Sequence, residues 1–169
     1  SKAYTGMLET LKMAFVATIF GFIGAIALSS FAAKNLVPKS VLVPTRLVLS
    51  FTRCLPSIIW AIVFVIVVGI GPLAGVLAMT LYTIGYLGKL QYEEIEGINR
   101  EPLEAARAMG LGHSEIVSKV VIPESSNTFL SQILFMFEYN VRHGTVLGLV
   151  GAGGIGLHID RAMELDLYN

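Results

Sequence analysis

Two charged residues near the end of an apolar stretch have the types and the spacing of either an ion pair or an anion site. Glu138 and Arg142 are four positions apart, acid before base, so on a helix they can neutralise each other. Arg142 can instead face a pathway and attract an anion, because its planar guanidinium suits phosphate-like oxygens. Ionisable residues inside a membrane segment are functional candidates by default. Both interpretations therefore stay open.

A glycine-rich run follows this pair and fits the G-x-G-x-x-G pattern of dinucleotide-binding turns. The run is Gly151-Ala152-Gly153-Gly154-Ile155-Gly156, after a β-like stretch at 145–150 and before a helix expected to begin at 157 and reach 167. The dinucleotide fingerprint also needs a parallel sheet and an acidic residue about 20 positions further on, whereas apolar spans precede this run. We therefore expect a close-packed loop near the mouth of a pathway, where glycines let two subunits approach.

The other reactive side chains form no recognisable set in the sequence. The histidines His113, His143 and His158 share no metal-ligand spacing, and no Ser/His/Asp, Cys/His or paired-carboxylate arrangement stands out. No phosphate-binding P-loop is present either. The single cysteine, Cys54, excludes an internal disulfide. The sequence thus predicts no active site, no metal and no resident cofactor.

The composition indicates a membrane protein. Of the 169 residues, 54% are hydrophobic and only 14% are charged, against about 25% charged in soluble domains. The mean hydropathy is +0.72. The formal net charge is zero, so nothing argues for a nucleic-acid surface. The chain begins without Met and ends in a polar stretch, and we expect both ends to continue in a longer protein.

Four stretches are long and apolar enough to be expected as membrane-spanning helices. They cover residues 13–31, 55–70, 73–87 and 125–139. An additional helix over 41–54 leads into the second span, and Pro56 is expected to bend the join. Small residues recur along the first span, which lets another helix approach closely. We therefore expect an all-α fold, a polytopic transmembrane helical bundle that forms a single domain over 1–169.

The lysines and arginines between the expected spans indicate the orientation. Eight of them fall on one side, namely Lys34, Lys39, Arg46, Arg53, Lys89, Arg100, Arg107 and Lys119. Four fall on the other side, namely Lys2, Lys12, Arg142 and Arg161. Because positive residues concentrate in cytoplasmic loops, this bias predicts a cytoplasmic position for the polar segment between the third and fourth spans. The glycine-rich run then faces outward.

That polar segment, residues 92–123, is expected to fold as two short helices. Pro102 suits the first turn of the first helix, where its missing N–H costs nothing. Gly110 can end this helix in a left-handed conformation, and Ser114 can cap the second. Pro123 can then open the next span. The small side chains would let another protein come within backbone contact, and an ordinary cytoplasmic loop is the alternative.

The spacing within this segment resembles the EAA motif of ABC-importer permeases. The motif reads Glu104-Ala105-Ala106, then Gly110, then Val120, Ile122 and Pro123, with aliphatic residues where the family has Ile-x-Leu-Pro. The resemblance implies a coupling helix that docks in a cleft of a separate ATPase subunit. For the acidic cluster at 92–96, contact with that ATPase is one expectation, and a solvated helix face is the other.

Further runs are similar to the phosphonate-importer permease branch and extend the resemblance over most of the chain. They are residues 53–61, 69–78, 88–90, 137–142 and 145–156, and the last is also similar to methionine-importer permeases. The resemblance implies the permease core of a type I ABC importer. It also implies a gate region, for which Glu138, Arg142, Gly151, Gly153, Gly154 and Gly156 are the candidates.

The resemblance implies partners as well. Such a permease lies in the lipid bilayer of the cytoplasmic membrane, pairs with a second copy, and receives substrate from an extracytoplasmic binding protein. ATP and Mg²⁺ belong to its ATPase subunits. The function expected is ATP-driven import of phosphonate or a related phosphorus oxyanion. A methionine-type importer permease is one alternative, and a secondary transporter or channel without an ATPase is the other.

Overall fold

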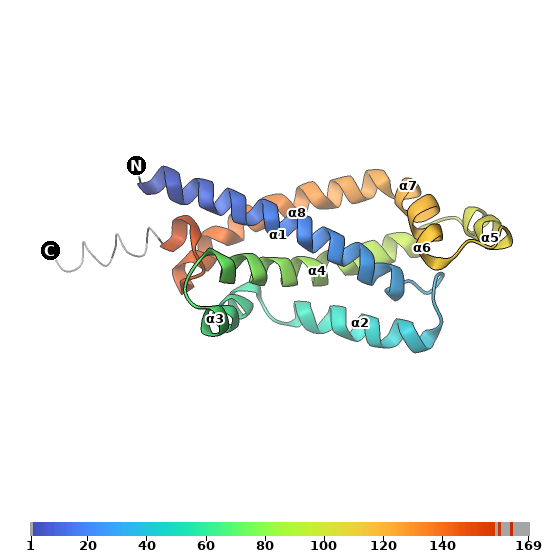
Figure 1. The fold of residues 1–169 in the computed structure, drawn as a ribbon, viewed down its shortest axis with the longest axis horizontal. Coiled ribbons are helices and arrows are strands. Elements are labelled where there is room, and N and C mark those ends of the chain that lie inside the picture. Colours follow the sequence, from blue (N-terminus) through green and yellow to red (C-terminus); the bar gives the residue numbers. More distant parts are fainter. Residues whose placement is uncertain (1, 158, 160–162, 164–169) are drawn as a thin grey trace.

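The computed structural model describes residues 2–157, 159 and 163, and among these residues it contains helices and no strand (Figure 1). The helices are α1 (Lys2–Ala32), α2 (Lys39–Cys54), α3 (Ser57–Val68), α4 (Pro72–Gly97), α5 (Arg100–Ala108), α6 (His113–Ile116), the π-helical turn η1 (Val117–Val121), α7 (Ile122–Glu124), α8 (Ser126–Leu147) and the 3₁₀ turn η2 (Gly148–Val150). The expected all-α class is confirmed.

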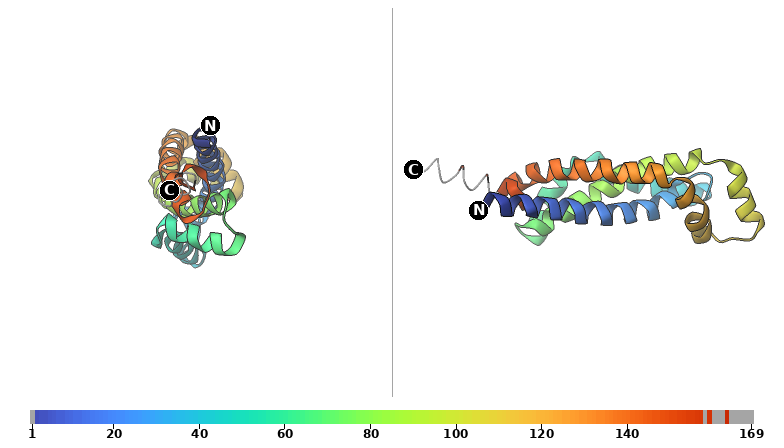
Figure 2. Two further views of the ribbon diagram at one scale, coloured as in Figure 1. Left: turned by 90° about the vertical axis from the view of Figure 1, so that its left-hand side faces the viewer. Right: turned by 90° about the horizontal axis from the view of Figure 1, so that it is seen from above.

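The long helices α1, α4 and α8 run side by side and form an elongated bundle (Figures 1 and 2). The short helices α5 to α7 lie at one end, and the glycine-rich run lies at the other. Helices α1 and α4 approach closely because α1 carries glycines at the contact. A Cβ added at Gly21 would lie 2.4 Å from Thr83 Cγ2. The predicted close approach at small residues is therefore confirmed.

A buried polar cluster ties these helices together at their centre. Asn140 of α8 donates from Nδ2 to the hydroxyl of Thr18 on α1 and to that of Thr83 on α4, each at 3.0 Å. All of these side chains are at most 2% exposed. Interhelical hydrogen bonds of this kind hold helices together where lipid replaces water. They fix the register of the bundle that carries the short helices at its end.

The observed helices match the expected spans unevenly. Both α1, from Tyr4 to Ala32, and α4 are long and apolar enough to cross a membrane. The span expected at 55–70 is different: α3 has 12 residues, about 18 Å of helix, and meets α2 at 89°. Taken together, α2 and α3 can be one broken span. Helix α8 has 22 residues but carries too many polar side chains to meet the same criterion.

The break between α2 and α3 lies at Pro56, as expected, and one hydrogen bond holds it. Leu55 is extended and ends α2, because the ring of Pro56 clashes with a helical conformation of the residue before it. The indole N–H of Trp60 on α3 donates to the carbonyl of Thr52 on α2 at 2.9 Å. The Trp60 side chain thus stabilises the 89° angle between α2 and α3.

The β-like stretch expected at 145–150 is wrong. Helix α8 continues to Leu147 and is followed directly by η2. Residues 154–157 are helical, but most of the helix expected over 157–167 lies outside the described residues, as do His158 and Arg161. The β-branched residues of the 145–150 stretch are accommodated in helical turns because tertiary packing overrides local propensity.

Candidate coupling site

The first residues of the segment that carries the EAA motif are part of the preceding long helix. Helix α4 continues to Gly97, so residues 92–97 belong to the long helix and the turn to α5 follows it. Pro102 occupies the first turn of α5, as predicted. Gly110 has φ +76° just after the helix end, which confirms the left-handed ending that glycine permits.

The second half of the segment differs from the expectation at both of its ends. Gly112, not Ser114, is the residue that caps α6, and its N–H donates to Glu115 Oε2 at 2.9 Å. This backbone hydrogen bond, helped by the charge of Lys119, lowers the pKa of the Glu115 carboxyl below its ordinary value. At the other end, Pro123 lies inside α7, and α8 begins at Ser126 after a bend. Pro123 therefore does not open the long helix.

The EAA motif is divided between a buried face and an exposed face of α5. Ala106 is 1% exposed and, with Leu103, packs against the chain's own core. Glu104, Ala105 and Gly110 are exposed. The inner face therefore fixes α5 to the bundle, and the outer face presents small side chains to whatever lies beyond it.

The remaining motif residues lie between α5 and the bundle. Val120 is partly buried against the same cluster as Ala106. Ile122 is 39% exposed, and Pro123 is exposed. Their role in coupling stays a prediction.

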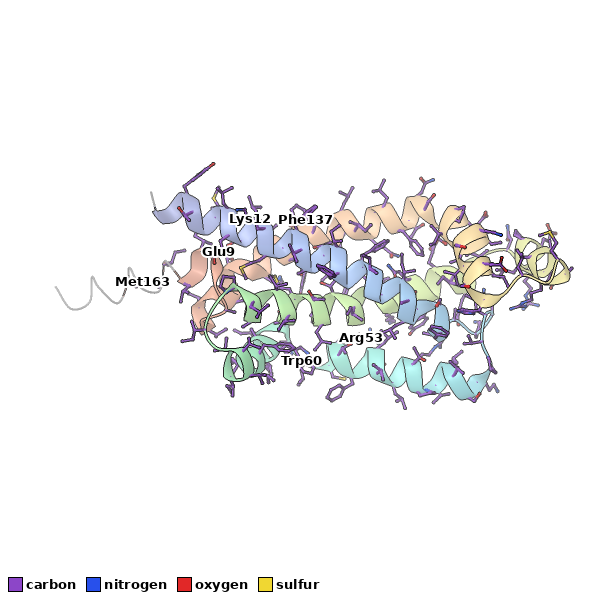
Figure 3. The ribbon with its side chains drawn as sticks, in the orientation of Figure 1. Glu9, Lys12, Arg53, Trp60, Phe137 and Met163 are labelled. Carbon is purple, nitrogen blue, oxygen red and sulfur yellow. The ribbon has the colours of Figure 1, made fainter. Side chains whose placement is uncertain are left out.

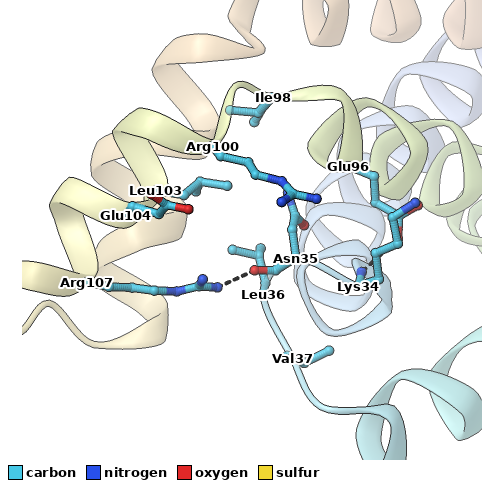
Figure 4. A pocket seen from close by; sticks show the side chains of 10 residues that line it. All are labelled: Lys34, Asn35, Leu36, Val37, Glu96, Ile98, Arg100, Leu103, Glu104 and Arg107. Carbon is cyan, nitrogen blue, oxygen red and sulfur yellow. Dashed lines mark hydrogen bonds and ion pairs between the residues drawn. The ribbon is translucent and has the colours of Figure 1, made fainter.

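A cavity of about 480 Å³ separates α5 from the connection between α1 and α2 (Figure 4). Arg107 of α5 reaches across it and donates to the backbone carbonyl of Asn35. Asn35 in turn donates from Nδ2 to the carbonyl of Ile95 near the end of α4, at 2.7 Å. Lys34, Arg100 and Glu104 also line the cavity. Helix α5 is thus joined to the connection between α1 and α2 and, through Asn35, to the end of α4.

Glu96 is the centre of the charged contacts under α5. Its carboxylate accepts from the Lys34 backbone N–H at 2.7 Å and lies 3.4 Å from Lys34 Nζ. It also binds Arg46 Nη2 of α2 at 2.5 Å, although its side chain is only 14% exposed. The solvated helix face expected for 92–96 is therefore wrong at Glu96, since this residue joins α4 to α2 and to the connection between α1 and α2.

His113 fastens the segment to α1 as well. Its ring stacks on Phe31 with centroids 4.8 Å apart, and its Nε2 lies 3.3 Å from the Ser30 hydroxyl. Sequence reasoning had found no role for this histidine. The stacking partner is 82 positions away in the chain, which no local pattern reveals.

The glycine-rich run at the far end of the bundle is packed by the chain itself. The Gly71 N–H donates to the Gly151 carbonyl at 2.9 Å, and the Ile155 N–H donates to the Thr10 hydroxyl at 2.9 Å. A Cβ at Gly156 would lie 2.0 Å from the Thr145 carbonyl oxygen. The close approach expected between two subunits is, at this glycine, an approach within one chain.

The predicted pairing of Glu138 with Arg142 is confirmed. Arg142 binds the Glu138 carboxylate one helical turn away, and the two side chains are 59% and 69% exposed for the acid and the base. Neither lines the cavities around the two ends of α5 or the break between α2 and α3. A path-facing role for Arg142 stays a prediction.

The helix expected over 41–54 contains Arg53, and the structure places Arg53 in the last turn of α2, next to the break at Pro56. What the sequence missed is a functional role for this residue, which it gave only as one of the cations between the first two spans. The signal that could have located it is its position at the end of an amphipathic helix just before a proline.

Comparison with known proteins supports the resemblance. A family model described as "Binding-protein-dependent transport system inner membrane component" matches residues 25–168. The phosphite transport system permease protein PtxC of Stutzerimonas stutzeri is 34% identical over 163 residues, which are 96% of this chain and 59% of that protein. The phosphate-import permease protein PhnE of Mycolicibacterium smegmatis is 37% identical over 169 residues, which are 98% of this chain and 32% of that protein. The chain spans less than two thirds of either relative's own length.

The fold is also found among solved transporters. The MetNI methionine ABC transporter in an inward-facing conformation superposes with a TM-score of 0.83 at 25% identity, over 98% of this chain and 82% of that chain. The expected type I ABC-importer permease core is therefore confirmed. As its resemblance to phosphonate-importer permeases predicted, this chain belongs to the family of binding-protein-dependent transport system inner membrane components.

Proposed function

We propose that this chain is the core of a permease subunit that imports a phosphorus oxyanion with energy from a separate ATPase. The observation that carries the proposal is the division of α5 into a buried face, with Leu103 and Ala106, and an exposed face, with Ala105, which the exposed Gly110 continues just beyond the helix end. A loop without a partner has no need of such bracing. A helix that must transmit force does need it, because α5 would otherwise move without moving the bundle.

The partners follow from this role. Two ATPase subunits, which carry ATP and Mg²⁺, receive the α5 helices of two permease copies, and an extracytoplasmic binding protein delivers substrate at the opposite end. The α5 end lies in the cytoplasm. Without Arg53, the lysine and arginine bias toward that side is still seven against four.

The contacts under α5 define how force reaches the bundle. When the ATPase subunits close, they draw the α5 helices together. Arg107 and the Glu96 contacts carry this displacement to α1, α2 and α4, while α6 to α7 lead it to α8. The helices then rock as a rigid unit and alternate the side to which the pathway opens. The stiff link is therefore the cluster around Glu96 rather than Pro123.

The substrate class follows from the relatives. PtxC and PhnE, named for phosphite and phosphate, are 34% and 37% identical to this chain, and the methionine transporter is 25% identical. A methionine-type importer is therefore the less supported alternative. A secondary transporter has no ATPase to bind, so it would not need an exposed α5 that is packed firmly against the bundle.

Replacing Gly110 with Asp in the full-length permease tests the proposal. The site of Gly110 is open in this chain and both Asp and Asn tolerate its left-handed conformation, so the permease should fold. The carboxylate would be buried without a partner in the ATPase cleft, and co-purification of the ATPase with Gly110→Asp should be lost. Gly110→Asn, which adds the same bulk without charge, should retain measurable association.

The result has a clear opposite. If Gly110→Asp is as well folded as the parent and captures the ATPase in the same amount, α5 is not the docking element. Phosphite uptake by proteoliposomes that is unaffected by removal of ATP would point to the secondary transporter.

A further inference from the structure

The last turn of α2 carries a cation that no described residue neutralises. The Arg53 side chain makes no hydrogen bond or ion pair with any residue that the structure describes, whereas the side chains of Arg46 and Arg142 each bind a glutamate. An arginine without a counter-charge retains its full attraction for an anion. It also carries a desolvation penalty that an anionic ligand would offset.

Arg53 lies halfway along the bundle. A Cβ at Gly85, which is at the middle of α4, would lie 3.3 Å from the Arg53 backbone nitrogen and 2.2 Å from Thr52 Oγ1. Figure 3 shows Arg53 at the same mid-length position, with Trp60 beside it at the start of α3. Because α4 is long and apolar enough to cross a membrane, this charge lies far from both ends of a candidate span.

A cavity of about 450 Å³ opens at this place, between the α2–α3 break, α4 and α8. Among its lining residues are Arg53, Ser57, Tyr82, Tyr139 and His143, and no carboxylate of the described chain lines it. The cavity around α5, in contrast, contains Glu96 and Glu104 beside its cations. The central cavity therefore offers positive charge and hydroxyl donors without competing negative charge.

Ser57 and the start of α3 add further hydrogen-bond donors. Ser57 is 6% exposed and lines the cavity, and its hydroxyl makes no hydrogen bond with any described residue. The Pro56 carbonyl accepts from the Ile59 N–H at 3.0 Å, but Pro56 provides no side-chain cap for the N–H groups of Ser57 and Ile58 before Ile59. The positive end of this 12-residue helix therefore faces the same space as Arg53.

His143 is held so that its second nitrogen remains available. Its Nδ1 lies 3.0 Å from the Tyr139 carbonyl, and a carbonyl can only accept, so the proton of the neutral ring is on Nδ1. The ring stacks on Tyr139 with centroids 3.7 Å apart. In the neutral ring Nε2 can accept a hydrogen bond from a P–OH group.

We propose that this cavity is a transient oxyanion site within the transport path, in which the Arg53 guanidinium binds a phosphite or phosphonate group beside the N-terminus of α3. The proposal rests on the proposed function and deepens it, since it names the residues that would hold the substrate halfway. Arg53 supplies two parallel N–H donors, Ser57 and Tyr82 supply hydroxyl groups, and His143 accepts from a protonated oxygen. Arg142, already paired with Glu138, is not needed.

The only cysteine of this chain provides a reporter inside the site. Cys54 is exposed and lines the same cavity as Arg53. In the full-length permease, with any cysteines outside this chain replaced by Ser, phosphite should slow modification of Cys54 by N-ethylmaleimide. Arg53→Gln should raise the phosphite concentration needed for protection by at least about tenfold, the effect of losing a charged hydrogen bond. Uptake of phosphite by proteoliposomes with the complete complex should fall in parallel.

Matched variants distinguish the loss of anion binding at Arg53 from the effect of removing a positive charge elsewhere on α2. Lys39→Gln removes a cation from the exposed first turn of the same helix and should change neither protection nor uptake. Arg53→Lys keeps the charge without the planar fork and should have an intermediate effect. Tyr82→Phe removes only a hydroxyl and should weaken protection by a few fold.

Two results would overturn the site. One is unchanged protection of Cys54 in Arg53→Gln, or in Arg53→Lys and Tyr82→Phe together if Arg53→Gln does not accumulate in the membrane. The other is loss of protection in Arg142→Gln but not in Arg53→Gln, which would locate the anion at Arg142 instead. Co-purification of the ATPase is measured on the same samples. A complex that assembles and transports without protection refutes this site alone, whereas one that never captures an ATPase refutes the proposed function.

Discussion

Most glycines of residues 148–156, at one end of the bundle, are crowded by the chain's own atoms, whereas Gly97 and Gly110, at the α5 end, face open space. A Cβ at Gly153 would lie 2.7 Å from Pro72 Cα, and one at Gly75 would lie 2.4 Å from the Ala152 carbonyl oxygen. A Cβ at Gly110 would meet nothing within 4 Å. The same residue type thus marks completed packing at one end and a surface without a neighbour at the other.

The difference extends to how each end is held. The glycine end is closed by backbone contacts, such as the Gly71 N–H on the Gly151 carbonyl at 2.9 Å. The α5 end is held by charged side chains, with Glu96 at their centre. Backbone packed against backbone leaves no room for an added side chain, whereas a charged contact at the α5 end can be removed by substitution without moving the backbone. The comparison predicts that substitutions at the glycine end affect folding and that those at the α5 end affect coupling.

The largest effect is expected for Gly156→Ala. Its new Cβ would lie 2.0 Å from the Thr145 carbonyl oxygen and 2.9 Å from Gly148 Cα, and neither backbone atom can rotate away. Overpacking of this kind should destabilise the fold by about 3 kcal/mol. The thermal unfolding temperature of the purified full-length permease, and its monodisperse fraction in detergent, measure the loss.

Gly97→Ala is the matched control, because a Cβ there would meet nothing within 4 Å. It should change the free energy of unfolding by less than about 1 kcal/mol. Equal melting temperatures for both variants would contradict the distinction between the crowded and the open end.

These crowded glycines also show what could be predicted from the sequence and what could not. The helices α1 and α4, the motif from Glu104 to Pro123 and the Glu138–Arg142 pair follow from local spacing, because hydrophobic runs and i,i+4 contacts are local properties. The partner of Gly156 is not local in this sense, since its crowding depends on how the run folds back on α8. A glycine-rich pattern therefore indicates close approach without saying to what.

Arg53 and Glu96 illustrate the same limit for charges. In the sequence both belong to the polar stretches that flank expected spans. In the structure Arg53 is at mid-bundle because α2 folds back along α4, and Glu96 is nearly buried because Lys34 and Arg46 meet it from two other segments. Charge position relative to a membrane depends on the path of the whole helix, which Pro56 redirects by 89°.

A smaller effect is expected for Glu96→Gln at the α5 end. The amide can still accept from the Lys34 N–H, but the charge that holds Lys34 and Arg46 is lost. Because the Glu96 side chain is only 14% exposed, we expect a loss of about 2 kcal/mol in stability. Substrate-stimulated ATP hydrolysis should fall more than ATPase association does. Helix α5 remains exposed and able to bind the ATPase, but its connection to the bundle is weaker.

Glu93→Gln serves as the control on the same helix. Its side chain is 51% exposed and, among the described residues, its carboxylate binds Lys89 alone, one turn away, so its loss should change stability by less than about 0.5 kcal/mol. If Glu96→Gln and Glu93→Gln uncouple ATP hydrolysis from uptake equally, the contact of Glu96 with Lys34 and Arg46 is not what links α5 to the bundle.

The smallest effect concerns Glu115 and is a matter of pH. The Gly112 N–H, and after it Lys119, lower the pKa of Glu115 in the folded segment below its ordinary value of 4.5. A lowered folded-state pKa means that the carboxylate contributes stability above the ordinary value, and that the contribution is lost as the pH falls from there through the folded-state pKa. Amide exchange of residues 112–116 should therefore accelerate in acid relative to Glu115→Gln, which has no such titration. Ser114→Ala should show the same amide exchange as the parent at every pH, because Gly112 holds the cap position. Faster exchange in Ser114→Ala would identify Ser114 as the cap. The α5 end would then depend less on charged contacts than its contrast with the glycine end predicts.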